Sequence, residues 1–484
     1  MRLIARPPTA TTPSVAGGLL RVARTDRRIV WRWAAAIIVV AAVARVGWAA
    51  WIAHAEPAAV ETPDTAGYLQ PAWALVEEGR FSLSPSDATP MYVRTPGYPA
   101  FLAPMLWLTD SEWAISPIQA IVSVAAVATT VLVGWRLFGT TVGLVAGSVV
   151  AVDPLQFLAA GTIMTESLTT VVLTAIVAVG AMVFALRRAG DVPLVAVLGL
   201  GALVAAATML RPTFWFYPVV LLALLAIRFR GLGRRSLVTR LLVFLLPIVV
   251  VVGGWQLRNH SAVDSWQVSG ISDINLYCYN AAEVEASVAG IDYDASRRRL
   301  GCPTEYPNPD GACTRTVGYG CWMPDPEADG QGFNEWGRKG LDIMLDHPVA
   351  SARVLGEGVV REIAGGARSR VSRYLDIDTS MPLTIALSAW VLALWVLAAI
   401  GALVGLRSKH RAFWAFVIAT IGYVILISTG TAGDARFRSP LVPLIALLAA
   451  LGIRRSLENL RRAPAPTPTL RQEQPAATAG SPAR

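Results

Sequence analysis

Long apolar stretches recur along almost the whole chain and are separated by short polar connections. A helix needs about 20 apolar residues to cross a hydrocarbon core that is roughly 30 Å thick. The pattern therefore predicts an all-α polytopic membrane protein with about ten transmembrane helices. The segments that meet this length requirement are 31–53, 115–136, 141–160, 163–186, 192–210, 212–229, 237–256, 382–406, 412–429 and 438–453.

Positively charged residues collect in alternate connections, which is how the cytoplasmic side is marked in membrane proteins. This predicts that both termini are cytoplasmic and that 54–114 and 257–381 form two large external loops. Residues 1–30 are then a basic cytoplasmic tail before a retained first anchor, and 31–456 form the bundle. The Pro/Ala-rich segment 457–484 is expected to be a disordered cytoplasmic tail. The charged residues that set this orientation are Arg24, Arg27, Arg28, Arg32, Arg136, Arg187, Arg188, Arg228, Arg230, Arg234, Arg235, Arg407, Lys409, Arg411, Arg454 and Arg455.

Composition supports the membrane assignment. Of the 484 residues, 54% are hydrophobic and 15% are charged, whereas an ordinary soluble domain carries about 25% charged residues. The formal net charge of +9 would suit a nucleic-acid-binding protein, but the basic residues lie in short clusters between apolar segments. We therefore read the charge as an orientation signal, and we expect membrane lipids as partners and no nucleic acid.

All four cysteines fall in the second predicted external loop: Cys278, Cys302, Cys313 and Cys321. Disulfides persist in oxidising compartments, so this placement agrees with an extracytoplasmic loop in a plasma membrane of the bacterial type. Four cysteines allow three pairings, between which the sequence does not choose. A zinc site is the alternative, but the close CxxC pairs that are typical of such sites are lacking.

The stretch AAVETPDTAGY follows the first apolar segment and places Asp64 just outside the membrane. After it, apolar residues recur at helical spacing from Tyr68 to Val76, and Gly79 is placed to end that helix. Pro71 predicts that the helix begins near Leu69, with the proline in its first turn. A helix of this kind lies flat in the membrane interface and holds Asp64 at headgroup depth.

Further polar side chains occur at the same predicted side of the bundle. Guanidinium groups match phosphate oxygens in a bidentate fork, and carboxylates there supply acid/base chemistry. Taken singly, each has a structural alternative: a helix cap, a favourable place at a helix dipole, a local ion pair or contact with lipid headgroups. Their convergence on one side favours a site for a phosphate-bearing ligand. The candidates are Asp64, Arg94, Asp153, Glu166, Arg211, Arg258, Arg436 and Arg438.

The motifs ETPDTAGY, EEGRFS and RTPGYPAFLAP resemble the first external loop of the C-type glycosyltransferases. This family of polytopic membrane enzymes includes protein O-mannosyltransferases and the lipid A aminoarabinose transferase. MTESL, LRPT, GWQLRNH and ARFRSPLVP extend the resemblance over roughly 31–455. It implies a bundle of membrane helices, two amphipathic helices of the first loop on the outer face, and a sugar donor carried on a polyprenyl phosphate.

The resemblance also assigns roles to residues. It implies that Asp64 is the catalytic acid of the first loop and that Glu166 is the second acid, with Asp153 as its competitor. Arg94 matches the basic or polar residue after the loop helices, and Arg436 or Arg438 matches the arginine before the last helix. Many relatives carry Asp-Glu where this chain has Asp64 and Thr65, so no cofactor is certain and a divalent metal stays an open alternative.

Together these features predict a hexosyl- or pentosyltransferase that moves a sugar from a polyprenyl-phosphate donor to an acceptor hydroxyl, with inversion, on the extracytoplasmic face. The acceptor is a protein, a lipid or a polysaccharide. The phosphate would be bound by Arg94, Arg258, Arg436, Arg438 and Arg211. A transporter or flippase of a lipid-linked or anionic substrate is the alternative, although such proteins tend to show repeated halves and polar groups at the midplane. A non-catalytic membrane partner is a further alternative.

Overall fold

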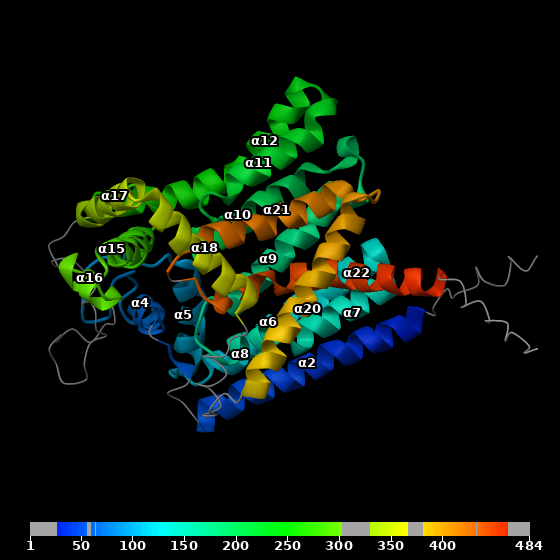
Figure 1. Ribbon diagram of the computed structural model, residues 1–484, viewed down its shortest axis with the longest axis horizontal. Helices are drawn as coiled ribbons and strands as arrows, with labels where there is room; N and C mark the ends of the chain where they lie inside the picture. The colour runs from blue at the N-terminus through cyan, green and yellow to red at the C-terminus, as the bar shows by residue number, and fades with distance from the viewer. Residues whose placement is uncertain are drawn as a thin grey trace, which may run out of the picture.

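The computed structural model describes residues 27–55, 60–62, 64–302, 330–365, 381–431 and 433–462. Regular structure within these ranges is helical, apart from one isolated antiparallel bridge between Ser82 and Pro90. This confirms the predicted all-α class. In Figure 1 long helices run beside one another through the body of the molecule, and shorter helices gather at one end.

Among the described residues, eight helices are long and apolar enough to cross a membrane. Each coincides with one of the predicted segments, because uninterrupted apolar runs of this length satisfy their backbone hydrogen bonds only as helices in lipid. They are α2 (Arg27–Ala55), α6 (Ile115–Phe138), α9 (Glu166–Ala181) with η1 (Met182–Leu186), η3 (Pro212–Phe214) with α11 (Tyr217–Phe229) and η4 (Arg230–Leu232), α12 (Arg234–Ile248) with η5 (Val249–Gly253) and α13 (Gly254–Val263), α20 (Met381–Leu406), α21 (Arg411–Ser428), and η7 (Ala435–Leu441) with α22 (Val442–Arg462).

The two remaining predicted segments are also helical but depart from a single long helix. The segment 141–160 consists of α7 (Thr140–Val152) and α8 (Pro154–Gly161), which are bent by 51° at Asp153. Proline cannot continue the hydrogen bonding of the helix before it, so Pro154 instead begins a new one. The segment 192–210 is α10 (Leu194–Leu210), whose 17 residues give a length of about 26 Å.

The chain forms a tightly packed bundle in which α22 is central. One cluster of buried apolar side chains extends through α6, α7, α9, α10, α21 and α22. Two glycines permit the close approach of α20 and α22. A Cβ atom at Gly401 would collide with the carbonyl of Leu448, and one at Gly452 with that of Leu397. Small residues at such crossings are typical of membrane helices, because packing rather than water exclusion holds them together.

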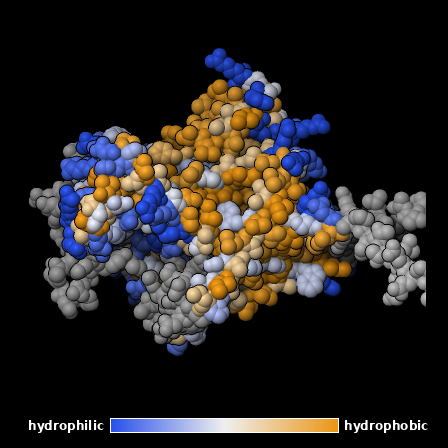
Figure 2. Space-filling model, in the orientation of Figure 1, coloured by the Kyte–Doolittle hydropathy of each residue, from blue (hydrophilic) through white to orange (hydrophobic). Residues whose placement is uncertain are grey.

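The shorter helices form a layer over one end of the bundle, which we call the loop face (Figure 1). Figure 2 shows that this end is hydrophilic, whereas the surface over the middle of the bundle is predominantly apolar. The helices of the loop face are α4 (Ala66–Glu77) and α5 (Gly97–Thr109) from the first loop, and α14 (Ile271–Ile274), η6 (Asn275–Ala281), α15 (Ala282–Ala289), α16 (Tyr293–Arg299), α17 (Gly330–Asp346) and α18 (Pro348–Ala364) from the second.

The first loop contains the two predicted helices, but α4 begins earlier than expected. Its first turn is closed by the carbonyl of Thr65, which accepts hydrogen bonds from the amides of Tyr68 and Leu69. Pro71 lies inside the helix. A proline there removes one hydrogen bond, and the buried side chains of α4 pack with those of α5 in one apolar cluster. Gly79 follows α4 with φ +66°, as its predicted role at the end of the helix requires.

A disulfide joins Cys278 of η6 to Cys302, just beyond α16, and ties α14 to α16 into one unit. Cys313 and Cys321 lie outside the described residues. At the other end of the chain, α22 continues to Arg462, so the helix extends into the segment 457–484 that was predicted as a disordered tail.

Candidate functional site

The carboxylate of Asp64 lies between two guanidinium groups. Arg94 Nη2 donates to Oδ1 of Asp64 at 2.7 Å, and Arg436 Nη1 donates to Oδ2 at 2.8 Å. The three residues come from the turn before α4, the segment before α5, and η7. They are partly accessible, with 27% of the Asp64 side chain, 11% of Arg94 and 23% of Arg436 exposed. A ligand that approaches the loop face can therefore reach Asp64 and its two arginines.

Local interactions fix the turn that carries Asp64. The Thr65 hydroxyl accepts a hydrogen bond from the amide of Thr62 at 2.8 Å and donates to the carbonyl of Ile163 at 3.1 Å. The second bond ties the first loop to the connection between α8 and α9. The backbone of the turn is thus fixed on both sides of Asp64, and the two arginines fix its carboxylate.

The two arginines are positioned by their own surroundings. The guanidinium of Arg94 lies over the ring of Tyr68, 4.8 Å from its centroid, a favourable cation–π arrangement. Arg436 is in η7, which Asp434 caps by accepting a hydrogen bond from the Arg436 amide at 3.4 Å. The guanidinium of Arg436 lies 4.9 Å from the ring centroid of Phe437.

A second acid–base pair adjoins the first. Glu166, the first residue of α9, is buried and lies 3.7 Å from Arg211, measured between Oε1 and Nη2. Neither oxygen of Glu166 has a hydrogen-bond partner among the described residues. The guanidinium of Arg211 lies over the same Phe437 ring as that of Arg436, 5.1 Å from the ring centroid. A cavity of about 10 Å³, lined in part by Glu166 and Arg436, lies beside them; this volume suits about one water molecule.

Asp153 and Arg438 lie next to the Glu166–Arg211 pair, and their own hydrogen bonds hold helices in place. Asp153 caps α8 by accepting hydrogen bonds from the amides of Leu155 and Gln156, at 3.1 and 3.3 Å. Its other oxygen accepts from the indole of Trp390 at 3.1 Å. The alternative that Asp153 ends or kinks a helix therefore fits its geometry.

Arg438 binds the carboxyl end of α18. Its guanidinium donates to the carbonyls of Glu362, Ile363 and Gly365, at 2.6, 3.0 and 2.8 Å. Cations near the last carbonyls of a helix are favourable, since those carbonyls lack partners within the helix. Arg438 thus links the second loop to η7.

Arg258 takes part in a different contact. It donates to the carbonyl of Met91 at 2.8 Å and to that of Phe81 at 2.9 Å, and it lies 4.9 Å from the ring centroid of Trp255. These bonds hold the first loop against α13. The structure does not pair Arg258 with Asp64, so its predicted contact with a donor phosphate has no support in this geometry.

Electrostatics distinguish Asp64 from an ordinary surface carboxylate. Burial alone would raise the pKa of Asp64, but Arg436 and Arg94 together outweigh it and hold that pKa well below its usual range. Burial would lower the pKa of Arg94, whereas Tyr68 and Asp64 raise it above its ordinary value. The site is therefore fully ionised at neutral pH, and Asp64 is a weak base as long as both guanidinium groups face it.

Sequence reasoning missed Glu362 of α18. The side chain is fully buried, and it lies near Arg211 and Arg438. A signal was present in the sequence, because Val354, Gly358 and Glu362 follow one another at four-residue spacing on the buried side of α18. An acid on the inward face of a helix is unusual unless it has a specific role.

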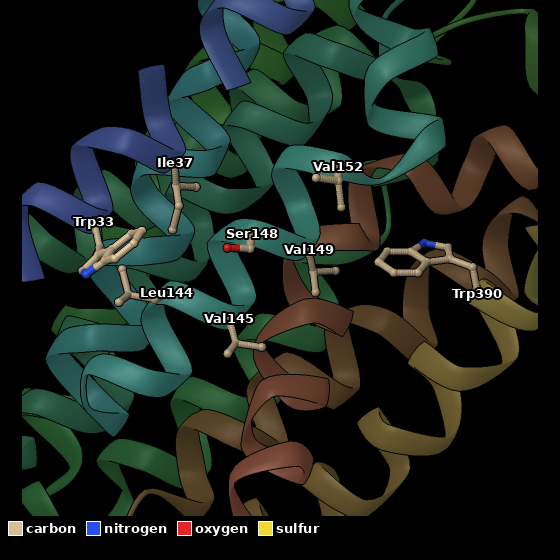
Figure 3. A pocket seen from close by; sticks show the side chains of 8 residues that line it. All are labelled: Trp33, Ile37, Leu144, Val145, Ser148, Val149, Val152 and Trp390. Carbon is tan, nitrogen blue, oxygen red and sulfur yellow. The ribbon is translucent and has the colours of Figure 1, made fainter. Parts of the chain in front are cut away.

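An apolar groove runs along the bundle next to Asp153 (Figure 3). It has a volume of about 470 Å³ and is lined by Trp33 and Ile37 of α2, by five residues of α7, and by Trp390 of α20. The two tryptophans stand on opposite sides, with α7 between them. Because Trp390 also binds Asp153, the groove reaches the bend between α7 and α8. The α7 residues are Leu144, Val145, Ser148, Val149 and Val152.

The described residues do not offer a metal site. No group of three or more His, Cys, Asp or Glu side chains lies close enough, within the described ranges, to hold a metal ion. The carboxylate of Asp64 already accepts a hydrogen bond on each oxygen. Thr65 donates its hydroxyl to Ile163, so the Asp64–Thr65 pair does not replace the paired carboxylates of the resembled family.

No family model and no curated protein matches the sequence, but solved structures share its fold. One is the Archaeoglobus fulgidus oligosaccharyltransferase in complex with Zn and sulfate, at 13% identity and a TM-score of 0.50, covering 88% of this chain and 49% of that one. Another is the same enzyme tethered to an acceptor peptide containing the NVT sequon, at 14% identity and a TM-score of 0.50, covering 89% and 50%. ArnT from Cupriavidus metallidurans bound to undecaprenyl phosphate gives 14% identity and a TM-score of 0.40, covering 89% and 79%.

The chain spans about half the length of the oligosaccharyltransferase chains that it matches. At this level of identity the likeness concerns the arrangement of helices alone. That arrangement agrees with the motifs of the first loop and with the apolar spans, which make the chain an integral membrane protein. The chain therefore shares the helical fold of the Archaeoglobus fulgidus oligosaccharyltransferase.

Proposed function

We propose that this protein transfers a sugar from a polyprenyl-phosphate donor to an acceptor hydroxyl at its loop face, with inversion at the anomeric carbon. The observation that carries the proposal is the ion-paired carboxylate of Asp64 between Arg94 and Arg436. It combines a candidate base with two phosphate-binding groups at the hydrophilic end of a membrane bundle. The fold that the chain shares with an oligosaccharyltransferase agrees with glycosyl transfer.

The ion pairs suggest how donor binding would activate Asp64. A donor phosphate that enters the site competes with Asp64 for the guanidinium groups of Arg94 and Arg436. Guanidinium binds phosphate and carboxylate in the same fork geometry, so the exchange needs little rearrangement. Once the arginines turn to the phosphate, the pKa of Asp64 rises toward its ordinary value of about 4. The carboxylate then becomes a better proton acceptor.

The chemical step follows from these positions. The acceptor oxygen forms a bond to the anomeric carbon while the bond between that carbon and the phosphate oxygen breaks. The bonding electrons leave with the polyprenyl phosphate, and the proton of the acceptor hydroxyl passes to Asp64. Arg94 and Arg436 stabilise the negative charge that grows on the phosphate. Arg211, which lies over the same Phe437 ring as Arg436, and its partner Glu166 extend the site toward α9.

The apolar groove beside α7 is suited to the isoprenoid part of such a donor. Four of the five α7 side chains that line it are aliphatic, the fifth being Ser148, and Trp390 on its far side binds Asp153. A lipid-linked donor keeps its tail in the bilayer and its sugar phosphate at headgroup depth. We therefore place the donor with its tail along α7 and its phosphate at Arg436, and we place the loop face outside the cytoplasm.

The decisive experiment supplies the purified protein, in nanodiscs, with a panel of polyprenyl-phosphate sugars and candidate protein, lipid and polysaccharide acceptors. A glycosyltransferase releases polyprenyl phosphate and forms a glycosylated product in equal amounts. A transporter or flippase would move the intact lipid-linked sugar across the bilayer without releasing phosphate. The proposal fails if a folded protein that binds these donors leaves them intact in the presence of every acceptor class.

A further inference from the structure

Glu362 is a buried acid for which the mechanism above has no use. It is 0% exposed, and neither of its carboxyl oxygens has a hydrogen-bond partner among the described residues. Burying an ionised carboxylate without such partners is strongly unfavourable, because the charge loses its hydration and gains no hydrogen bond in exchange. A residue that served packing alone would be apolar at this position, so the acid calls for a functional explanation.

The charged groups that act on Glu362 connect it to the proposed donor site. Arg211, at the end of α10, and Arg438 of η7 both lower its pKa, although less than burial raises it. Arg211 is also the partner of Glu166. Two acids on other elements that pack on α18 have partners of their own: Glu283 of α15 acts on the exposed Arg353, and Glu335 of α17 pairs with Lys339. Asp434, at the start of η7, acts on Arg436 and Arg438.

The acids and arginines around η7 form one alternating cluster, which we call the charged cluster. Four arginines face five acids, so the cluster carries one negative charge when every member is ionised and is neutral when Glu362 alone is protonated. A negative cluster repels an anionic donor more than a neutral one does. The members, in order of contact or electrostatic influence, are Arg94, Asp64, Arg436, Glu166, Arg211, Glu362, Arg438, Asp153 and Asp434.

We propose that Glu362 sets the affinity of this cluster for the donor phosphate: its protonated carboxyl removes one negative charge from beside Arg211 and Arg438, and its carboxylate form opposes phosphate binding. This inference rests on the proposed function and adds a positioning residue to it. Glu362 acts through the arginines and does not touch the reacting atoms. This role for Glu362 leaves the proposed acceptor, sugar and catalytic base as they are described above.

The sign of the effect follows from the titration of Glu362. Burial raises the pKa of Glu362 to about 8, against the opposing effect of Arg211 and Arg438. The group is therefore mostly neutral at pH 7 and becomes negative as the pH rises through about 8. Phosphate affinity is thus highest below this pH and falls above it. Because the phosphate favours the protonated form, binding near pH 8.5 takes up protons from solution.

The test measures the affinity of the full-length protein in nanodiscs for farnesyl phosphate between pH 7 and 9.5. The second pKa of a phosphate monoester is about 6, so the probe keeps its charge across this range. We expect the affinity of the native protein to fall about tenfold from pH 7 to pH 9.5, because one negative charge is added near the phosphate at a partly screened site. Glu362→Gln should give a flat profile, with the affinity that the native protein has at pH 7.

Glu357→Gln is the matched control, since Glu357 lies on α18 but is exposed and pairs with Arg353. It should keep the pH profile of the native protein. Proton uptake on binding, followed with an indicator dye, tests the native protein directly, so the result does not depend on the folding of a variant. A flat native profile, an unchanged profile in Glu362→Gln, or the absence of proton uptake would each refute the role of Glu362.

The outcomes separate this inference from the proposed function. If Arg436→Gln abolishes binding while Glu362→Gln keeps the native pH dependence, the donor site stands and the inference about Glu362 falls. If the folded native protein binds no polyprenyl phosphate at any pH, the proposed donor site and the inference both fall.

Discussion

Arg436 Nη1 lies 2.8 Å from Oδ2 of Asp64, although 372 residues separate them along the chain. The first loop is thereby fastened to η7 through an ion pair that is partly open to the loop face. Arg94 holds the second oxygen of the same carboxylate. Two arginines that already bind one anion with good geometry can bind another that replaces it. This exchange leads to predictions that a purely structural ion pair would not make.

Replacing Asp64 by Asn should separate binding from chemistry. Transfer should fall by roughly 10²- to 10⁴-fold, the usual contribution of a general base. Affinity for polyprenyl phosphate should rise, because Arg94 and Arg436 no longer have a carboxylate to give up. Single-turnover transfer and equilibrium binding, measured on the same preparation, check both parts. If the variant folds normally and transfers sugar at the native rate, Asp64 is not the base.

Replacing Arg436 by Gln should weaken polyprenyl-phosphate binding by roughly ten- to a hundredfold, because a hydrogen bond to a charged group contributes about 1.5–3 kcal/mol. Arg353→Gln is a suitable control. Arg353 is exposed on α18 and pairs with Glu357, and surface pairs of this kind contribute little. Equal losses in both variants would show that general positive charge, rather than the contact at Asp64, attracts the ligand.

Asp153 provides a test of a structural role against a catalytic one. Its side chain caps α8, and removal of an N-cap costs about 1 kcal/mol. Asp153→Ala should therefore lower the thermal midpoint, whereas Asp153→Asn should keep both the cap and the transfer rate, since Asn caps equally well. A large loss of transfer in a stable Asp153→Asn protein would instead show that Asp153 takes part in catalysis.

Much of the bundle was predictable because apolar length alone identifies a membrane helix. All ten predicted segments lie on helices, and the predicted segment 141–160 contains a bend at Asp153. Pro154 predicts a bend at this position, but it does not predict the angle. The angle depends on how α8 packs on η7. Likewise, the start of α4 at Ala66 depended on Thr65, whose contact with Ile163 is long-range.

The candidate site was predictable only in part. The motifs brought Asp64, Arg94 and Arg436 to attention, and the structure joins them. The sequence did not separate Arg436 from Arg438, because both occur in ARFRSP and only the fold shows which one faces Asp64. Glu362 was missed since its burial results from contacts between α18 and η7, which lie far apart along the chain. The four-residue spacing of Val354, Gly358 and Glu362 indicates an inward face of α18, but it does not show which groups that face meets.

The disulfide between Cys278 and Cys302 should stabilise the loop face. Loss of a native disulfide in a small unit typically costs about 2–5 kcal/mol, and this bridge encloses most of η6, α15 and α16. Cys278→Ser with Cys302→Ser should lower the thermal midpoint and weaken donor binding, because Asn280 of η6 binds the amide of Thr431 near η7. Limited proteolysis of the loop face measures the loosening. Unchanged proteolysis would show that the bridge adds no constraint.

The groove beside α7 leads to a prediction about the length of the donor's isoprenoid chain. Ser148→Trp should fill the groove and raise KM for a long-chain donor by more than tenfold. Each methylene that is excluded from an apolar surface forfeits about 0.8 kcal/mol, so a few displaced methylenes are enough. A short-chain donor does not reach this part of α7, and its KM should stay close to that of the native protein.

Val195→Trp on α10 is the matched control for the groove. Val195 is an exposed apolar residue outside the groove, so a tryptophan there adds the same bulk to the apolar surface without obstructing it. Both variants should retain the native thermal midpoint. If Ser148→Trp raises KM equally for long and short donors, it has disturbed the charged cluster through α7 and α8. If it changes neither KM, the isoprenoid tail follows another path along the bundle.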